Sequence, residues 1–388
     1  MAVTRKLRMG MVGGGSGAFI GAVHRRSATL DGDVELVAGA FSSDRHKGLA
    51  SGRSMFVPDE RNYAGWEEMA EREAALPPDE RIDFVSIVTP NALHYPIARK
   101  FCEAGINVVC EKPMTLNATE AIQLGEVVRK SGVIFALAHT YTGYPMVKQA
   151  REFARSGVLG RIGRVTVNYS HGNMLGVTGA ALAARWRTDP ALSGISNSVA
   201  DIGTHCENLI RYVTGLSIDR LCADLHRAPG NVLDNEAAIL IDFLGGAKGV
   251  IQTSQLCAGD QNNLTLRVHG DKASLEWVQV SPEQLWLRPQ GEPSRLYRRG
   301  DKGLCSAAQK ATRLPPGHPE GFIEALANVY ANVCDAIRAR LAGEPEDVER
   351  DYPGISDGEI GMKFVETVVA ADAGTAKWVI FPTSADPS

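Results

Sequence analysis

The first third of the chain alternates between short apolar runs and segments whose apolar residues recur with helical spacing. The apolar runs predict buried strands over 7–12, 34–40, 83–88, 106–110 and 133–138. The segments between them predict helices to about residue 30, over 66–75, to about residue 104 and over 118–130. Continuous apolar strands joined by short loops to helices are typical of a parallel sheet covered on both faces. We therefore expect a doubly wound α/β domain over residues 1–140.

Beyond about residue 160, apolar and polar residues alternate along longer segments. These segments are 164–171, 219–225, 236–243, 248–256, 264–269 and 274–278. Gly245-Gly246 predicts a hairpin between two of them. Alternation of this kind indicates an antiparallel sheet with one exposed face. We expect an α+β domain over 141–388, with a large, mostly antiparallel open sheet.

Further elements are predicted around this second sheet. Helices at 199–214, 319–342 and 357–372 are expected to cover one of its faces. Residues 289–317, rich in Arg, Gly and Pro, are expected to form a mobile loop. The other face is expected to make subunit contacts in a homodimer or homotetramer.

Composition narrows the choice of partners. The 388 residues carry a net charge of −4 with acidic and basic residues interspersed, which argues against a nucleic-acid or anionic-membrane partner. No apolar run reaches membrane-spanning length, and the first strand follows the start of the chain directly, so a cytoplasmic location is expected. The seven cysteines are widely spaced without a C-x-x-C, which predicts reduced thiols and no metal site.

A glycine cluster, Gly13-Gly14-Gly15-Ser16-Gly17, directly follows the first predicted strand. Glycines let backbone N–H groups approach a pyrophosphate, and the following helix adds the positive end of its dipole. The motif fits G-x-G-x-x-A as Gly13, Gly15 and Ala18, or it closes at Gly21 instead. Its position at the first strand–helix junction predicts a Rossmann dinucleotide-binding domain. The expected cofactor contacts here are Gly13, Gly15, Gly17, Ala18, Phe19 and Ile20.

The end of the second strand bears on which dinucleotide binds. An NAD enzyme usually carries an acid there for the ribose hydroxyls, whereas this chain has Phe41-Ser42-Ser43, followed by Asp44 and Arg45. Ser42, Ser43 and Arg45 suit a 2′-phosphate. Both NAD and NADP stay open on this pattern.

Two polar turns follow neighbouring strands of the predicted parallel sheet. Glu111-Lys112-Pro113 stands at the carboxyl end of strand 106–110, where doubly wound sheets bind ligands, so Glu111 and Lys112 are expected to contact the cofactor. Thr89-Pro90-Asn91 ends the preceding strand, with His94 three residues on. These groups are expected to contact the ribose or nicotinamide; His94 alternatively caps the helix that begins there.

The second domain contributes a candidate acid and base. Asp201 and His205 are four residues apart, so on a helix they project from one face and can position a hydroxyl and take its proton. The same spacing also fits an ordinary surface pair. Arg185-Trp186-Arg187, ahead of this helix, suits a polyol through hydrogen bonds and ring stacking, or is an exposed basic turn.

Taken together, these residues resemble the Gfo/Idh/MocA family of NAD(P)-dependent oxidoreductases, which includes glucose–fructose oxidoreductase and inositol dehydrogenases. The resemblance implies that Lys112, Asp201 and His205 form the catalytic set. It also implies substrate contacts from Lys112, Tyr141, Arg185, Trp186, Asp201 and His205. Two departures stand out: the glycine loop looks about two residues longer than usual, and Thr142 follows Tyr141 where the family often has an arginine.

The expected reaction is hydride transfer between nicotinamide and a secondary alcohol or ketone of a sugar, glycoside or cyclitol. His205 is expected to act as general base, Lys112 to stabilise the developing alkoxide, and Asp201 to orient the substrate or the imidazole. Two alternatives stay open. One is NAD-dependent glycoside cleavage or epimerisation through transient oxidation. The other is a non-catalytic sugar or nucleotide sensor, against which the three intact catalytic residues count.

Overall fold

The computed structural model describes residues 5–344 and 351–382, which form two compact units. The first unit comprises the residues up to Thr115, Thr119–Thr140 and Phe322–Glu359. The second comprises Leu116–Ala118, Tyr141–Gly321 and the residues from Ile360 onward. The chain therefore returns to the first unit after completing most of the second.

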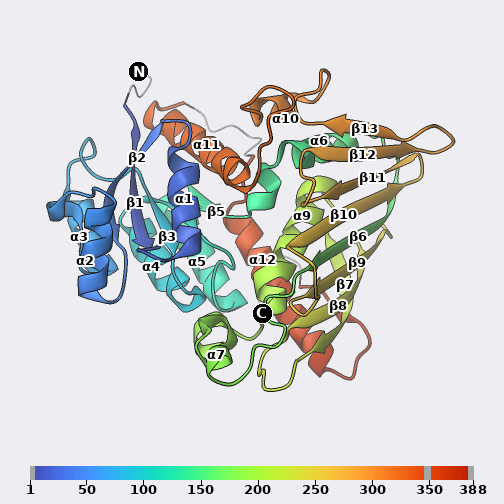
Figure 1. Cartoon of the computed structure of the whole chain (residues 1–388), viewed down its shortest axis with the longest axis horizontal. Helices are drawn as coiled ribbons and strands as arrows, with labels where there is room; N and C mark the ends of the chain where they lie inside the picture. The colour runs from blue at the N-terminus through green and yellow to red at the C-terminus, as the bar shows by residue number, and fades with distance from the viewer. Residues whose placement is uncertain (1–4, 345–350, 383–388) are drawn as a thin grey trace. The chain divides into compact units, whose positions relative to one another are not determined.

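The first unit is built on a parallel five-stranded sheet in the order β2-β1-β3-β4-β5 (Figure 1). Its strands are β1 (Leu7–Gly13), β2 (Val34–Ala40), β3 (Phe84–Val88), β4 (Asn107–Cys110) and β5 (Phe135–Leu137). Its helices are α1 (Phe19–Thr29), α2 (Arg45–Ser54), α3 (Trp66–Ala75), α4 (His94–Glu103), α5 (Ala118–Ser131) and α11 (Phe322–Leu341). The predicted parallel α/β sheet is confirmed, with every predicted strand present; α2 was not anticipated.

The strand order fixes where a ligand binds in this unit. The chain runs from β1 outward to β2 and then crosses to β3 on the other side of β1, so the winding direction reverses between β1 and β3. Ligands of open α/β sheets bind outside the carboxyl ends of the strands at such a reversal. The glycine loop after β1 and the polar turn after β3 both lie at this edge.

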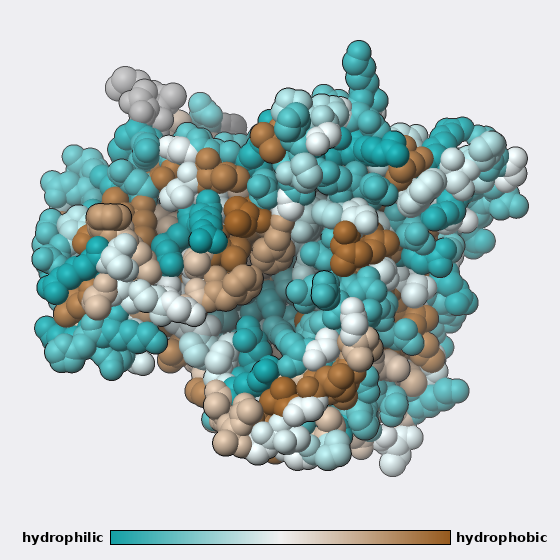
Figure 2. All heavy atoms as spheres, viewed as in Figure 1, coloured by the Kyte–Doolittle hydropathy of each residue, from teal (hydrophilic) through white to brown (hydrophobic). Residues whose placement is uncertain are grey.

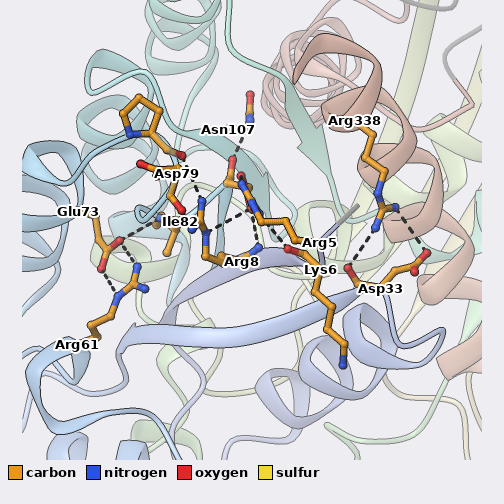
Figure 3. A network of polar contacts seen from close by, with 12 residues as sticks. Arg5, Lys6, Arg8, Asp33, Arg61, Glu73, Asp79, Ile82, Asn107 and Arg338 are labelled. Carbon is orange, nitrogen blue, oxygen red and sulfur yellow. Dashed lines mark hydrogen bonds and ion pairs between the residues drawn. The ribbon is translucent and has the colours of Figure 1, made fainter. Parts of the chain in front are cut away.

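Helix α11 packs in the first unit, so the prediction that it covers the antiparallel sheet is wrong. Leu326, Val329 and Val333 belong to the same buried cluster as Leu7 and Met11 of β1. Arg338, near the end of the helix, also pairs with Asp33 at 3.5 Å (Figure 3). An amphipathic pattern shows that a helix has an apolar face, but not which sheet that face covers.

The amino ends of the strands are tied by buried carboxylates. Asp83 accepts hydrogen bonds from both terminal nitrogens of Arg5, at 2.6 and 2.8 Å. Glu73, whose exposed fraction is 0%, accepts from Arg61 at 3.0 and 2.5 Å and from the Ile82 N–H at 3.0 Å (Figure 3). These ties stabilise the end of the sheet opposite the ligand-binding edge.

The second unit contains a nine-stranded sheet in the order β13-β12-β11-β10-β6-β9-β8-β7-β14. Neighbouring strands are antiparallel except for β6 and β9, which are parallel. The strands are β6 (Ile162–Ser170), β7 (Ile218–His226), β8 (Glu236–Phe243), β9 (Lys248–Ser254), β10 (Asn263–Gly270), β11 (Ala273–Val278), β12 (Gln284–Pro289), β13 (Arg295–Arg298) and β14 (Val379–Ile380). Gly245 and Gly246, with φ of +86° and +93°, join β8 to β9 as the predicted hairpin. The mostly antiparallel open sheet is confirmed.

Several helices accompany this sheet. They are α6 (Pro145–Arg155), α7 (Gly179–Ala183), α8 (Pro190–Ser193), α9 (Thr204–Thr214) and α10 (Ser306–Lys310). Helix α9 packs on β6, and α6 packs on α9, β11 and β12. Helix α12 (Ile355–Ala373) begins in the first unit and continues into the second.

The segment 289–317 is not the long loop that its composition predicts, because it contains β13 and α10. Arg299, which is buried, explains this order. Its guanidinium pairs with Glu283 at 2.5 Å and Glu320 at 3.0 Å, and it donates to the Leu314 carbonyl at 2.7 Å. An arginine-rich composition suggests exposure, but one fully bonded arginine can organise a segment around itself.

Figure 2 shows that hydrophilic residues cover most of the visible surface and that apolar residues form scattered patches. All seven cysteines are free thiols, as predicted. In the described ranges, none of the helices has the length and apolar character that crossing a membrane requires.

Candidate active site

The glycine loop spans the gap between the end of β1 at Gly13 and the start of α1 at Phe19. Gly13, Gly14 and Gly17 all have positive φ, between +67° and +87°. A Cβ on Gly21 would lie 2.3 Å from the Gly14 Cα, so this helical glycine brings α1 against the loop. Close helix–strand packing is the role of the last glycine in a dinucleotide fingerprint. The geometry therefore favours the reading that closes at Gly21, with a longer loop.

Neighbouring elements hold this loop in place. The Gly15 N–H donates to the Phe41 carbonyl after β2 at 3.2 Å, and the Ser16 N–H donates to Ser51 Oγ of α2 at 3.0 Å. The cap residue of α1 is Ala18, whose side chain cannot accept a hydrogen bond from the first N–H groups of the helix. The first turn of α1 also contains no acidic residue. Uncapped N–H groups at the positive end of a helix fit a diphosphate.

The turn after β3 holds Thr89, Pro90 and Asn91. Thr89 Oγ1 is buried and has no hydrogen-bond partner among the residues that the structure describes. A Cβ on Gly13 would lie 2.9 Å from the Thr89 methyl group, so this side chain lies beside the glycine loop. A buried hydroxyl without a partner costs free energy unless a ligand satisfies it, which again fits a bound dinucleotide.

His94 is the first residue of α4 and is buried. Its Nδ1 lies 2.8 Å from the Pro113 carbonyl oxygen and its Nε2 lies 2.9 Å from the Thr89 carbonyl oxygen. Burial lowers the pKa of the His94 imidazole, although both carbonyl acceptors favour the protonated ring. His94 therefore joins the turns after β3 and β4, a role that the sequence analysis did not consider.

Lys112 follows β4 at the same edge. The Glu111 N–H extends the β3–β4 pairing by donating to the Ile87 carbonyl at 2.9 Å, and the Lys112–Pro113 peptide bond is cis. Lys112 is half-buried, and its backbone N–H donates to Glu111 Oε2 at 3.1 Å. Burial opposes ionisation of Glu111, but the hydrogen bond from His24 and the nearby positive charges outweigh it and lower the pKa of this carboxyl. Glu111 is thus an ionised group turned into the protein beside the candidate catalytic lysine.

The turn after β2 carries Ser42, Ser43 and Arg45, of which Ser43 and Arg45 are exposed. Ser42 Oγ accepts from the Asp44 N–H at 3.2 Å. Asp44 caps α2 by accepting from the Lys47 N–H at 2.9 Å, and this bond lowers the pKa of the carboxyl. Asp44, which follows the strand directly in sequence, is thus committed to the cap of α2.

In the second unit, Asp201 lies in a single π-helical turn (Val199–Gly203) and His205 in the first turn of α9. The predicted helix over 199–214 is therefore not regular at its start, because the Thr204 N–H donates to the carbonyl of Val199. Such turns are frequent at functional sites. The Asp234 carboxylate holds this start by accepting from the N–H groups of Asn197 and Val199, both at 2.9 Å.

Two tyrosines surround His205. The Tyr141 ring packs edge-on against the imidazole with 4.8 Å between ring centroids, and its hydroxyl lies 2.5 Å from that of Tyr169. Burial raises the pKa of both phenols, so both hydroxyls keep their protons. Tyr141 was predicted, whereas Tyr169 was missed; the only sequence signal was its inward position in the alternating pattern of β6.

The arginine–tryptophan turn differs in detail from expectation. The Arg185 guanidinium lies 3.3 Å from the Met174 sulfur. It is Arg187, which belongs to the same tripeptide but was not among the predicted substrate contacts, whose guanidinium stacks on the Trp186 ring at 4.4 Å and lies 3.5 Å from Asp201 Oδ1. The second unit thus brings Trp186, Arg187 and Asp201 together.

Comparisons with known proteins agree with this geometry. A profile described as "Oxidoreductase family, NAD-binding Rossmann fold" matches residues 7–139, and one described as "GFO/IDH/MocA C-terminal domain" matches residues 147–276. An uncharacterized oxidoreductase of Bacillus subtilis, YfiI, is 33% identical over 98% of each chain. An inositol dehydrogenase homolog from Azotobacter vinelandii, solved with NAD+, superposes with a TM-score of 0.91 at 34% identity over 98% of each chain. An oxidoreductase from Sinorhizobium meliloti superposes with a TM-score of 0.86 at 41% identity, over 97% of this chain and 100% of the other.

These matches confirm the NAD-binding Rossmann domain and the resemblance noted from the sequence. The protein is an NAD-binding oxidoreductase of the sugar and cyclitol dehydrogenase type. From the glycine loop to the antiparallel sheet, the chain belongs to the Gfo/Idh/MocA family.

Proposed function

We propose that this protein oxidises a secondary alcohol on the ring of a neutral sugar, glycoside or cyclitol, and reduces the corresponding ketone in reverse. Among its relatives, a levoglucosan dehydrogenase from Pseudarthrobacter phenanthrenivorans is 25% identical over 82% of each chain. An inositol dehydrogenase homolog from Azotobacter vinelandii was solved with NADH and myo-inositol. Both ligands are neutral polyols, which the hydroxyl and ring groups around His205 suit.

The observation that carries the proposal is the position of Lys112. It follows β4 at the carboxyl edge, beside the β3 turn and the glycine loop that would hold the dinucleotide. The bound nicotinamide supplies the hydride acceptor. An amine at this edge can donate a hydrogen bond to the reacting hydroxyl oxygen and stabilise the alkoxide that develops as the hydride leaves.

The other proposed roles fall to the second unit. His205 would take the hydroxyl proton as general base, in an environment where both neighbouring phenols keep their own protons. Asp201 would orient the substrate by accepting from a second hydroxyl, with Arg187 at 3.5 Å neutralising its charge when no substrate is bound. Trp186 offers an apolar ring face for the C–H side of a sugar.

Lys112→Ala tests the proposal. We expect kcat with a polyol substrate to fall by about 10²- to 10⁴-fold, while the Kd for NADH measured by fluorescence changes little. Lys100→Ala is the matched control, because this lysine of α4 pairs at the exposed surface with Glu71 at 3.2 Å, a contact that contributes little. Near-normal turnover by Lys112→Ala, with activity equal to that of Lys100→Ala, would rule the proposal out.

Two further features, the assembly of subunits and the choice of dinucleotide, extend this proposed function. We propose a homodimer or homotetramer through the exposed face of the nine-stranded sheet, which light scattering tests directly. The choice between NAD and NADP rests on Ser42, Ser43 and Arg45. Replacing Arg45 by Ala should weaken NADP binding and spare NAD binding if this arginine holds a 2′-phosphate.

A further inference from the structure

A buried chain of polar side chains lies directly behind the Lys112 turn in the first unit. We propose that this chain positions Lys112 for catalysis through the Glu111 carboxylate. Its members are Ser86 of β3, Tyr330 of α11, His24 of α1 and Glu111 after β4. The inference rests on the proposed function, because it takes Lys112 to be the catalytic lysine.

Short contacts link the chain from end to end. The Tyr330 hydroxyl lies 2.6 Å from His24 Nδ1 and 2.8 Å from Ser86 Oγ. His24 Nε2 lies 2.8 Å from Glu111 Oε1, and the second carboxylate oxygen accepts from the Lys112 N–H at 3.1 Å. The exposed fractions are 0% for His24 and 1% for Tyr330, so water does not compete for these bonds.

The hydrogen-bonding capacity of each group assigns the protons. An ionised carboxylate only accepts, so His24 Nε2 must carry a proton and donate it to Glu111. In the neutral imidazole Nδ1 is then an acceptor, and the Tyr330 hydroxyl donates to it. The Ser86 hydroxyl in turn donates to the Tyr330 oxygen and also lies 3.2 Å from His24 Nδ1. Donation along the chain therefore runs from Ser86 and Tyr330 through His24 to the Glu111 carboxylate, which also accepts from the Lys112 N–H.

Stability alone does not account for such a chain. Replacing a satisfied buried polar network by well-packed apolar residues is often neutral or stabilising. Here three separate elements, β3, α11 and α1, each contribute one polar group to a chain that leads to the carboxylate bonded to the Lys112 N–H. In metal sites, a group that orients a ligand through its neighbour typically changes affinity or activity about 10- to 100-fold when it is removed, and we expect an effect at the lower end of that range here.

Removing the Tyr330 hydroxyl tests this role. We expect Tyr330→Phe to lower kcat about tenfold, while the KM for the alcohol and the Kd for NADH stay within about twofold. Tyr63→Phe is the matched control, because Tyr63 is also buried and donates to a buried carboxylate, Glu73, at 2.7 Å. The Tyr63 hydroxyl bonds to Glu73, which accepts from the Ile82 N–H ahead of β3 and makes no contact with Glu111. Tyr63→Phe should therefore keep full kcat, even where its stability falls as far as that of Tyr330→Phe.

Two variants of His24 keep the test informative if Tyr330→Phe folds poorly. His24→Gln retains an N–H donor for Glu111 and should keep more of kcat than His24→Leu, which has none. In the protein without cofactor, nitrogen NMR of labelled histidine should show His24 as the tautomer protonated on Nε2. A proton on Nδ1 alone would overturn the assignment.

The failure of this inference differs from the failure of the proposed function. If Lys112→Ala is inactive while Tyr330→Phe and Tyr63→Phe both keep full kcat, the positioning role falls and the function stands. If Lys112→Ala is fully active, the proposed function falls first.

Discussion

The crossing of α1 over the glycine loop yields a prediction whose size follows from the coordinates. A Cβ on Gly21 would lie 2.3 Å from the Gly14 Cα and 2.5 Å from its carbonyl oxygen. Non-bonded carbons pack at about 3.5–4.0 Å, so Gly21→Ala must push the helix and the loop apart by more than about 1 Å. Because both partners are backbone, no side chain can rotate to relieve the clash.

Two losses follow for Gly21→Ala. Overpacking of this kind costs about 1–3 kcal/mol in the free energy of unfolding. Displacing the loop also breaks its alignment with the dinucleotide phosphates. If about two backbone hydrogen bonds are lost at roughly 1 kcal/mol each, the Kd for NADH rises at least about tenfold. Urea unfolding and a fluorescence titration with NADH measure the two effects.

Gly361→Ala is the matched control. Gly361 lies within α12, and a Cβ there meets no atom within 4 Å. The same substitution should therefore stabilise the protein by about 0.5–1 kcal/mol through helix propensity and leave NADH binding unchanged. If Gly21→Ala instead binds NADH as tightly as the wild type and is equally stable, the close packing of α1 on the loop is refuted.

Three further predictions concern the rest of the chain. Glu73→Gln should lower the free energy of unfolding by about 3–5 kcal/mol in urea titrations, because it leaves the Arg61 charge without its buried partner; a loss below about 1 kcal/mol contradicts this. Asp234→Asn should lower kcat more than it weakens NADH binding, because it removes one of the two acceptor oxygens that hold the π-helical turn. A variant that binds NADH more weakly but keeps its kcat would contradict this role for Asp234. Below pH 6.5 the unfolded chain protonates His94 before the folded one does, because its pKa is lowered in the fold, so stability falls as pH drops through this window. Thermal unfolding of His94→Gln should show a flatter pH dependence between pH 7 and 5 than the wild type, and equal slopes would exclude this cause.

The parallel sheet was predictable because its signals are local. Each strand is a continuous apolar run bounded by turn residues, and the glycine cluster marks the first strand–helix junction. The hairpin at Gly245-Gly246 was equally local, since both residues adopt positive φ. Where the conformation of a segment depends on its own residues, the hydrophobic pattern and the residue propensities are enough to predict it.

The errors came from long-range packing. Nothing in the helical pattern of 322–341 distinguishes the parallel sheet from the antiparallel one, and the choice depends on partners such as His24, which is far away in sequence. Likewise, Arg299 orders 289–317 through carboxylates on both sides of the segment. Such contacts become visible only once the chain is folded.

The residues of the candidate site also fall into two groups, those that a local motif predicts and those that only long-range packing brings into place. Lys112, Asp201 and His205 were found because each stands in a short motif with a recognisable spacing. Tyr169 belongs to no motif, and the tripeptide that contains Arg187 does not show which residue its guanidinium contacts; only the fold brings them next to Tyr141 and Asp201. Positioning residues are therefore harder to predict from sequence than the groups that they position.

Deuterium transfer tests the central claim most directly. The protein is incubated with NAD+ and a polyol, myo-inositol or levoglucosan, that carries deuterium on its ring carbons, and the nicotinamide is analysed by mass spectrometry. We predict that reduced nicotinamide accumulates with deuterium from the alcohol carbon, and that Lys112→Ala abolishes this transfer. A product that forms while no label accumulates in the free nicotinamide, or an equal transfer by Lys112→Ala, would contradict the account.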